Sequence, residues 1–305
     1  MSRTLQLLTG TPVNKPTDAY AYIKLKTPGI YRSFAHFENL HVEERDFFKK
    51  PIKFGNLELL KNNFNLQTIT RTREEVHGPH APDIFPDCEY SLSREHIALY
   101  NKLVEEQLLL FDDGTMIDAT SMQKLRHALQ QVVVNFDHFS NNPKNVSTAY
   151  DLLDHTLEEI EDNKLIVWIN YRRTAASVLN YLKGRGITAM AAYGGSDSQA
   201  AVSSFMDPAG CQVLVGHYQS CGAGLNPQEV CFNSLFLELS TVPLYVRQAL
   251  GRISRTGQKR IPVQRLAVAR GTVQVHLLRS LVNNDDLVAT IEPTKKSVRA
   301  MLLGE

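Results

Sequence analysis

Lys164-Leu-Ile-Val-Trp-Ile-Asn170 is a short, almost wholly apolar run, and it predicts a strand that is buried on both faces. A helical period follows over roughly residues 174–182. The alternation continues, with strands predicted near 187–191, 212–216, 234–239 and 263–268, and helices near 198–205, 243–253 and from about 272. Apolar strands that alternate with helices predict an α/β fold, in which a parallel sheet is covered on both faces.

Residues 31–144 have a different pattern, because their apolar residues recur at helical spacing and strand-like runs are scarce. Amphipathic helices are predicted over 94–108 and 125–134, each with one apolar stripe and charges opposite. We therefore expect a mostly helical region before the parallel sheet.

The composition is that of an ordinary folded protein: 305 residues, 43% hydrophobic and 21% charged, with a net charge of +1. This length suffices for two folded regions, and the charge gives no global argument for a nucleic-acid or membrane partner. The sequence has no signal peptide and no apolar run of about 18 residues. We expect a protein that is neither exported nor membrane-spanning, located in the cytoplasm or the nucleus.

The four cysteines are widely spaced and form no Cys-x-x-Cys pair. We expect Cys88, Cys211, Cys221 and Cys231 to be buried, reduced thiols, and we predict no metal site built from them.

The stretch Gln248-Ala-Leu-Gly-Arg-Ile-Ser-Arg-Thr-Gly-Gln258 carries two arginines three residues apart, a spacing that places both on one helix face. No acidic residue occurs between Leu239 and Asn284. The basic residues in that interval are Arg247, Arg252, Arg255, Lys259, Arg260, Arg265, Arg270 and Arg279. Such a run is either a solvated basic face or a field of one sign that needs an anionic partner.

This pattern resembles the last helicase motif of superfamily-two motors, and its Arg-Thr-Gly-Gln-Lys-Arg ending resembles the Swi/Snf version. The resemblance implies a RecA-like lobe in which Arg252 and Arg255 act as fingers on the γ-phosphate of ATP, with Gln248 beside them. The charge that develops on a transferred phosphoryl group is met by such planar donors.

Other stretches resemble the remaining motifs in the same order. Leu8-Thr-Gly-Thr-Pro12 looks like the third motif, which implies that Thr9 and Thr11 couple ATP hydrolysis to nucleic-acid movement. Pro28-Gly29, Arg71-Thr-Arg-Glu-Glu-Val76 and Phe85-Pro-Asp87 follow the spacing of the helical insertion in Swi/Snf motors.

The strand at 166–170 with Tyr171 and Arg172 looks like the fourth motif, and the loop Gly194-Gly195-Ser196 like the segment after it. Both should face nucleic acid, and the helix that follows the loop could bind a backbone phosphate at its N-terminus. Where the family commonly carries an arginine on that helix, this chain has residues 199–201, Gln-Ala-Ala, which places that contact in doubt.

Val213-Leu-Val-Gly-His-Tyr-Gln-Ser-Cys-Gly-Ala-Gly-Leu-Asn226 resembles the fifth motif, in which small residues let the backbone approach phosphate and ribose. The best matches, expected to bind the nucleotide, are Gly222, Gly224, Leu225 and Asn226. His217 follows a strand alone, and a structural role is favoured over a catalytic one.

No glycine-rich loop with lysine, GxxxxGK[ST], occurs in the chain, and Asp112-Asp113 lies inside the helical region rather than after a strand. The groups that hold Mg²⁺ and the phosphates of ATP are therefore expected on a missing first lobe. Three explanations stay open: a divided gene with a separate partner polypeptide, a truncated frame, or a second lobe reused for nucleic-acid binding.

These expectations divide the chain into a first-lobe remnant (1–30), a helical Swi/Snf-type insertion (31–144) and a second RecA-like lobe (145–305). The implied function is the C-terminal half of an ATP-dependent helicase or translocase on double-stranded DNA, inactive without a first lobe. The alternative is a non-catalytic DNA-binding or regulatory module. A Rossmann-type nucleotide enzyme is disfavoured, because Gly222-Ala-Gly224 lacks the third glycine.

Overall fold

The structure is a computed structural model that describes residues 6–8, 12–13, 15–46, 49–71, 75, 83–106, 108–110, 116–118, 122–140, 142, 144–194, 197–221 and 225–291. The chain divides into two compact units, residues 1–80 with 281–305 and residues 81–280. The boundaries expected after residues 30 and 144 do not coincide with this division. They stay a prediction, because compactness does not test which helicase segment a residue belongs to.

The second unit is built on a sheet of five parallel strands in the order β10-β9-β6-β8-β7. The strands are β6 (Leu165–Ile169), β7 (Ala189–Ala192), β8 (Val213–His217), β9 (Asn233–Phe236) and β10 (Val263–Leu266). The parallel α/β sheet expected from the sequence is confirmed.

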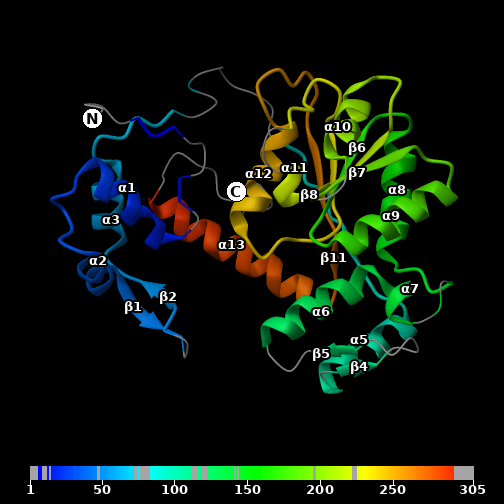
Figure 1. Ribbon diagram of the computed structural model, residues 1–305, viewed down its shortest axis with the longest axis horizontal. Helices are drawn as coiled ribbons and strands as arrows, with labels where there is room; N and C mark the ends of the chain where they lie inside the picture. The colour runs from blue at the N-terminus through cyan, green and yellow to red at the C-terminus, as the bar shows by residue number, and fades with distance from the viewer. Residues whose placement is uncertain are drawn as a thin grey trace. The chain divides into compact units, whose positions relative to one another are not determined.

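Both faces of this sheet are covered, because every residue of the central strand β6 is buried. One face packs on α8 (Ala149–Ile160) and α9 (Arg172–Gly184). On the other face Trp168 stacks on Tyr218 of α11 (Tyr218–Cys221), with ring centroids 5.7 Å apart. Figure 1 shows α8 and α9 on one side of the strands and α11 on the other.

The remaining helices of the α/β part are α10 (Ser198–Met206), α12 (Pro243–Ile253) and α13 (Val273–Ile291). Asp197 caps α10 by accepting a hydrogen bond from the Ala200 amide. Proline begins α12, where its missing N–H costs nothing. The boundary between the two units falls inside α13.

The helical part of the second unit precedes the sheet. It contains β3 (Glu89–Tyr90), α5 (Arg94–Glu106), β4 (Leu108–Leu110), β5 (Met116–Asp118), α6 (Met122–Val134) and α7 (Phe136–Phe139). Helices α5 and α6 pack together, and His96 of α5 hydrogen-bonds the carbonyl oxygen of Val132 at 2.8 Å. The helical region expected before the sheet is therefore present.

The first unit contains a 3₁₀ turn η1 (Pro16–Asp18), α1 (Ala19–Lys26), α2 (Phe34–His41), α3 (Leu57–Asn65) and the antiparallel pair β1 (Val42–Arg45) and β2 (Pro51–Phe54). A buried polar group holds its core: the Tyr31 hydroxyl contacts His41 Nε2 at 2.7 Å and accepts from Asn63 Nδ2 at 3.0 Å. The β1–β2 and β4–β5 pairs were not predicted. Residues of β1 and β2 are mostly exposed, so they lack the buried alternation that marks a strand in sequence.

Within the part of the chain that the structure describes, no helix is both long and apolar enough to cross a bilayer.

Candidate ATP site and nucleic-acid interface

The predicted arginine motif lies at the end of α12 and in the turn that follows it. Gln248 and Arg252 are four residues apart in α12, which places them on one helix face. The helix ends at Ile253, so Arg255 follows it, and helical spacing does not account for the position of that side chain. The turn instead relies on Gly257, whose φ of +93° suits glycine.

Glutamine at the end of the motif secures this turn. Gln258 Nε2 donates to the carbonyl oxygens of Ile253, at 3.1 Å, and Cys231, at 2.9 Å. Because carbonyls in the last turn of a helix lack backbone partners, this side chain satisfies one of them and ties the turn to the start of β9.

The two arginines contact the segment expected to bind the nucleotide. Arg252 Nη1 donates to the backbone oxygen of Leu225 at 3.1 Å, and Arg255 Nη1 donates to Asn226 Oδ1. Leu225 is buried and Asn226 is exposed. Two motifs that the sequence placed separately therefore meet at one site.

The electrostatics of this site favour an anion. Partial burial, and then the positive charge of Arg255, lower the pKa of Arg252 from its ordinary value, whereas Cys221 acts in the opposite direction. Neighbouring guanidinium groups repel each other, so an anion bound by both would lower the free energy of the pair.

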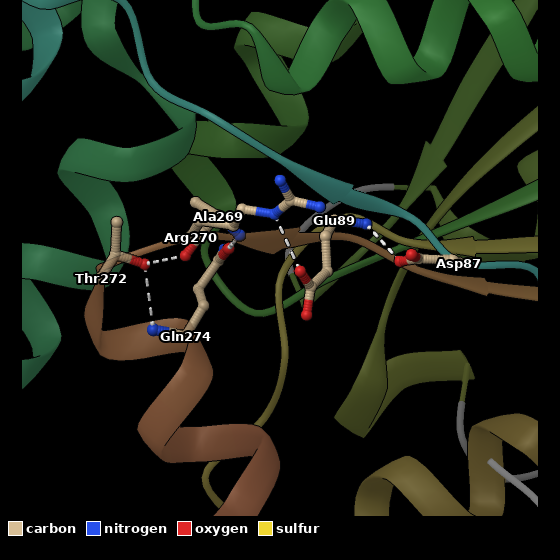
Figure 2. Close-up of polar contacts among 6 residues, drawn as sticks. All are labelled: Asp87, Glu89, Ala269, Arg270, Thr272 and Gln274. Atoms are coloured by element: carbon tan, nitrogen blue, oxygen red, sulfur yellow. Dashed lines mark hydrogen bonds and ion pairs between the residues drawn. The ribbon is translucent and has the colours of Figure 1, made fainter. Parts of the chain in front are cut away.

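The basic run that precedes and follows these arginines is not a field of one sign, and this corrects the expectation from sequence. Arg265 is buried and its Nη2 lies 2.9 Å from Glu159 Oε1. Arg270 Nε lies 2.8 Å from Glu89 Oε2, a pair that Figure 2 shows. Acidic partners come from elements distant in sequence, so the run as a whole does not require an anionic ligand.

A buried carboxylate positions the N-terminus of α9. Glu238 Oε2 accepts from the backbone amides of Asn170, at 2.7 Å, and Tyr171, at 3.0 Å, and Oε1 accepts from the Thr174 hydroxyl at 2.6 Å. Burial raises the pKa of Glu238 to about 7, against the lowering effect of these donors. The Tyr218 hydroxyl donates to the Glu238 carbonyl oxygen at 2.7 Å, which joins α11 to the same point.

Tyr171 is a connecting residue rather than a surface aromatic ring. Its hydroxyl donates to Gln130 Oε1 at 2.9 Å and lies 2.9 Å from His127 Nδ1, so it ties the start of α9 to α6. Burial, the largest cause, raises the pKa of the Tyr171 hydroxyl above its ordinary value. The hydroxyl is thus engaged within the protein, although the ring borders the groove that begins here.

An open groove of about 640 Å³ lies between α6, α7 and the start of α9. Three cations line it, namely Lys124, Arg172 and Arg173, together with His127. Among the residues that the structure describes, none that lines this groove is acidic. A Cβ added to Gly194 would lie 3.1 Å from Arg172 Nη2, so the predicted fourth-motif arginine and the loop glycine are neighbours.

His217 has structural hydrogen bonds at both ring nitrogens. Its Nε2 lies 2.9 Å from the Asn170 carbonyl oxygen, and its Nδ1 accepts from the Gln219 amide at 3.3 Å. Burial lowers the pKa of His217, which favours the neutral ring. These bonds agree with the structural role inferred from sequence.

The four cysteines are buried free thiols, as predicted. Burial raises the pKa of Cys88 and Cys221 to about 11 and that of Cys231 to about 12. Cys88, Cys221 and Cys231 therefore stay protonated at neutral pH.

Six of the predicted site residues lie outside the described part of the chain. They are Thr9, Thr11, Gly195, Ser196, Gly222 and Gly224.

Sequence reasoning missed several side chains of these sites. Lys124 and His127 lie on a helix interpreted only as amphipathic, and no local signal links them to residue 172. Glu238 did have a signal, because it is a lone carboxylate within the apolar run Ser234-Leu-Phe-Leu-Glu-Leu239. A buried charge in such a run is functional or structural, since burial without hydrogen bonds is costly.

Comparison with known proteins places this geometry in context. No family model matches the chain. An uncharacterized ATP-dependent helicase of Bacillus subtilis (strain 168), YqhH, is 25% identical in an alignment of 303 residues that covers 90% of this chain and 52% of the relative. The chain thus spans about half the length of that curated relative.

A solved structure shares the fold. The C-terminal part of the Fun30 ATPase domain superposes with a TM-score of 0.52 at 13% identity, over 70% of this chain and 99% of that structure. The parallel sheet and the helical region before it agree with the expected RecA-like lobe. The resemblance expected from the sequence is confirmed to this extent: the chain is similar to a protein described as an ATP-dependent helicase and shares the fold of a C-terminal ATPase lobe.

Proposed function

We propose that this chain is the second ATPase lobe of a motor that translocates on double-stranded DNA, and that it supplies arginine fingers to an ATP site. One observation carries the proposal. The adjacent cations Arg252 and Arg255 contact Leu225 and Asn226, so the two motifs expected to bind nucleotide form one site.

Each residue of this site has a role in the proposal. Arg252 and Arg255 donate to phosphoryl oxygens, and Gln248 lies on the same face of α12 as Arg252. Asn226 and the backbone at Leu225, with Gly222 and Gly224, approach the ribose and phosphates. ATP with Mg²⁺ fits a site whose like charges lie close together, because its phosphates would offset their repulsion.

A first lobe completes the ATP site in this proposal. The chain has no lysine loop of the GxxxxGK[ST] type, so the groups that hold Mg²⁺ and orient the attacking water come from elsewhere, such as a separate polypeptide. The lone chain is then expected not to hydrolyse ATP. Turnover by a purified sample of the lone chain saturated with duplex DNA would contradict this expectation.

The groove between α6 and α9 is the proposed DNA-backbone contact. Lys124, Arg172 and Arg173 present positive charge at one opening. Contacts of this kind give affinity without sequence preference, as a translocating motor requires.

The groove also keeps a second function open, a non-catalytic DNA-binding module. Replacing Arg252 by alanine discriminates between the two, using the chain completed with its first lobe. A motor loses DNA-stimulated ATP turnover and keeps its DNA affinity, whereas a binding module shows no turnover to lose. The matched control is Arg279→Ala, a basic residue outside α12 and the groove.

A further inference from the structure

The parallel sheet of the second unit has an extra strand-like segment along its β10 edge. Residues 83–90, here called the edge segment, run parallel to β10 and to the short strand β11 (Val268–Ala269). The pairing bonds are Ile84 N to Pro262 O and Gln264 N to Ile84 O, both 2.8 Å, Val268 N to Cys88 O, 3.2 Å, and Arg270 N to Tyr90 O, 2.8 Å. The edge segment therefore covers an edge that would otherwise be open.

The far end of the edge segment is held by side chains. Figure 2 shows the ion pair between Glu89 and Arg270, and beside it Gln274 Oε1 accepting from the Ala269 amide. Figure 2 also shows Asp87, which accepts a hydrogen bond from the amide of Glu89, two residues further along the chain, at 3.0 Å. This end pairs with β11 through the amides of Val268 and Arg270.

The near end of the edge segment contacts the arginine motif through one carboxylate. Asp83 Oδ1 accepts from the Ser254 hydroxyl at 2.8 Å, and Oδ2 accepts from Gln264 Nε2 at 2.6 Å. Gln264 is fully buried, and the same Nε2 also donates to the Leu250 carbonyl oxygen in α12 at 3.1 Å. One acidic residue thus connects the end of α12 to strand β10.

Ser254 has a special place in this motif, because it lies between Arg252 and Arg255 and caps the C-terminus of α12. Its backbone leaves the helix with φ −90° and ψ 73°. Helix ends fray, and two neighbouring guanidinium groups repel each other, so the turn at 254–258 needs a fixed point. Gln258 fixes the far side of this turn, and the hydrogen bond from Ser254 to Asp83 fixes its start.

We propose that Asp83 is a positioning residue for the arginine fingers: by binding Ser254 and Gln264 it fixes the turn that carries Arg255 relative to α12. The inference rests on the proposed function, since it assumes that Arg252 and Arg255 meet ATP. It assigns to a segment upstream of the parallel sheet a role in the ATP site that none of the helicase-like motifs indicates.

Four variants test this role. Asp83→Ala removes both bonds, and Ser254→Ala removes one while leaving Gln264 in place. Asp83→Asn can keep both, because its amide can donate to the Ser254 oxygen and its carbonyl can accept from Gln264. Glu89→Ala is the matched control, since it removes an exposed carboxylate from the same edge segment at the end that pairs with β11.

The first measurement uses the lone chain and needs no ATP. Hydrogen exchange at the Gln258 amide, which donates to the Arg255 carbonyl oxygen, reports whether the turn is formed. Asp83→Ala and Ser254→Ala are expected to speed exchange over 254–258 by about tenfold, while β6 and β8 exchange as before and Asp83→Asn resembles the parent. Unchanged exchange in this turn would overturn the proposal whatever the chain's function.

The second measurement uses the chain completed with its first lobe. Asp83→Ala and Ser254→Ala are each expected to lower kcat for ATP by about 10- to 100-fold with little change in KM for ATP, since a misplaced finger costs rate rather than binding. The double variant should be no worse than Asp83→Ala, and Glu89→Ala should keep full turnover. A loosened turn with an unchanged kcat would also overturn the proposal. Failure of the proposed function is seen separately, as turnover that survives Arg252→Ala.

Discussion

Replacing Glu238 with glutamine removes an ionisable group from the interior of the second unit and tests whether burial raises its pKa. Glu238 is 1% exposed, and its two oxygens accept from two backbone amides and the Thr174 hydroxyl. Glutamine can keep its oxygen on the two amides and donate its Nε2 to the hydroxyl oxygen of Thr174. The substitution therefore removes the charge with little change in shape.

The expected effect is a change in how stability depends on pH. The pKa of Glu238 is raised to about 7 in the folded protein, mainly because burial disfavours the charged form. A raised pKa means that the folded state holds the proton more tightly than the unfolded state. Its contribution to stability is thus fully present below pH ~4.5 and is lost as the pH rises through 7, a difference of about 2–3 kcal/mol between pH ~5 and pH ~8.

Urea unfolding of the parent and of Glu238→Gln at several pH values measures this contribution. Trp168 is the only tryptophan of the chain and lies buried in the same sheet, so its fluorescence follows the unfolding of this unit. The free energy of unfolding of the variant, relative to the parent, should rise by about 2–3 kcal/mol from pH ~5 to pH ~8. Glu229→Gln, an exposed glutamate of the same unit, is the control and should show no such rise. Parallel pH curves for the parent and Glu238→Gln would refute the raised pKa of this buried carboxyl group.

Three further outcomes are expected. Lys124→Ala and Arg172→Ala should each weaken binding of duplex DNA of any sequence and lower the slope of log K against log salt by about 1. Fluorescence anisotropy measures both quantities, and an unchanged slope would exclude the groove as a contact for the DNA backbone. Glu159→Gln should leave the buried Arg265 without its ion pair and lower the free energy of urea unfolding by about 1–2 kcal/mol. This loss is below the usual cost of breaking a buried pair, because Glu159 is half exposed. An unchanged free energy of unfolding would mean that Arg265 is solvated. Burial lowers the pKa of His41, so the stability that the neutral ring contributes is present above pH ~6.5 and is lost as the pH falls. Thermal melts at low pH should show this loss in the parent and not in His41→Gln. Equal losses in both proteins would contradict a neutral His41 ring.

The parallel sheet could be predicted because its signals are local. The run at 164–170 is apolar on every side chain between its ends, and the structure places β6 at Leu165–Ile169, buried throughout. The predicted helix over 243–253 is α12, which begins at the proline that opens the pattern. In both cases a few residues that are neighbours in sequence suffice to predict the element.

The charge balance could not be predicted, because it depends on pairs that are far apart in sequence. Arg265 meets Glu159 from α8, and Arg270 meets Glu89 from β3. A count of charges along the sequence includes the basic residues of this run but not their acidic partners, so it overestimates the positive charge around the run. The same limit applies to Asp83, whose partner Ser254 is 171 residues away.

Local pattern also missed how the groove is assembled. Arg172 was predicted because it follows the strand that resembles the fourth motif. Lys124 belongs to α6 and lines the same groove as Arg172, because Tyr171 joins the start of α9 to α6 through Gln130 and His127. Short strands such as β4 and β5 were missed as well. Three residues are too few to establish an alternating pattern against the helical spacing around them.

ATP turnover of the completed enzyme with Arg252→Lys shows whether Arg252 acts as a finger, because lysine keeps the charge and loses the planar pair of donors. We expect kcat to fall by about 1,000-fold while the affinity for duplex DNA stays within about twofold. Turnover that remains at the level of the parent would contradict the assignment of Arg252 as a finger on the phosphates.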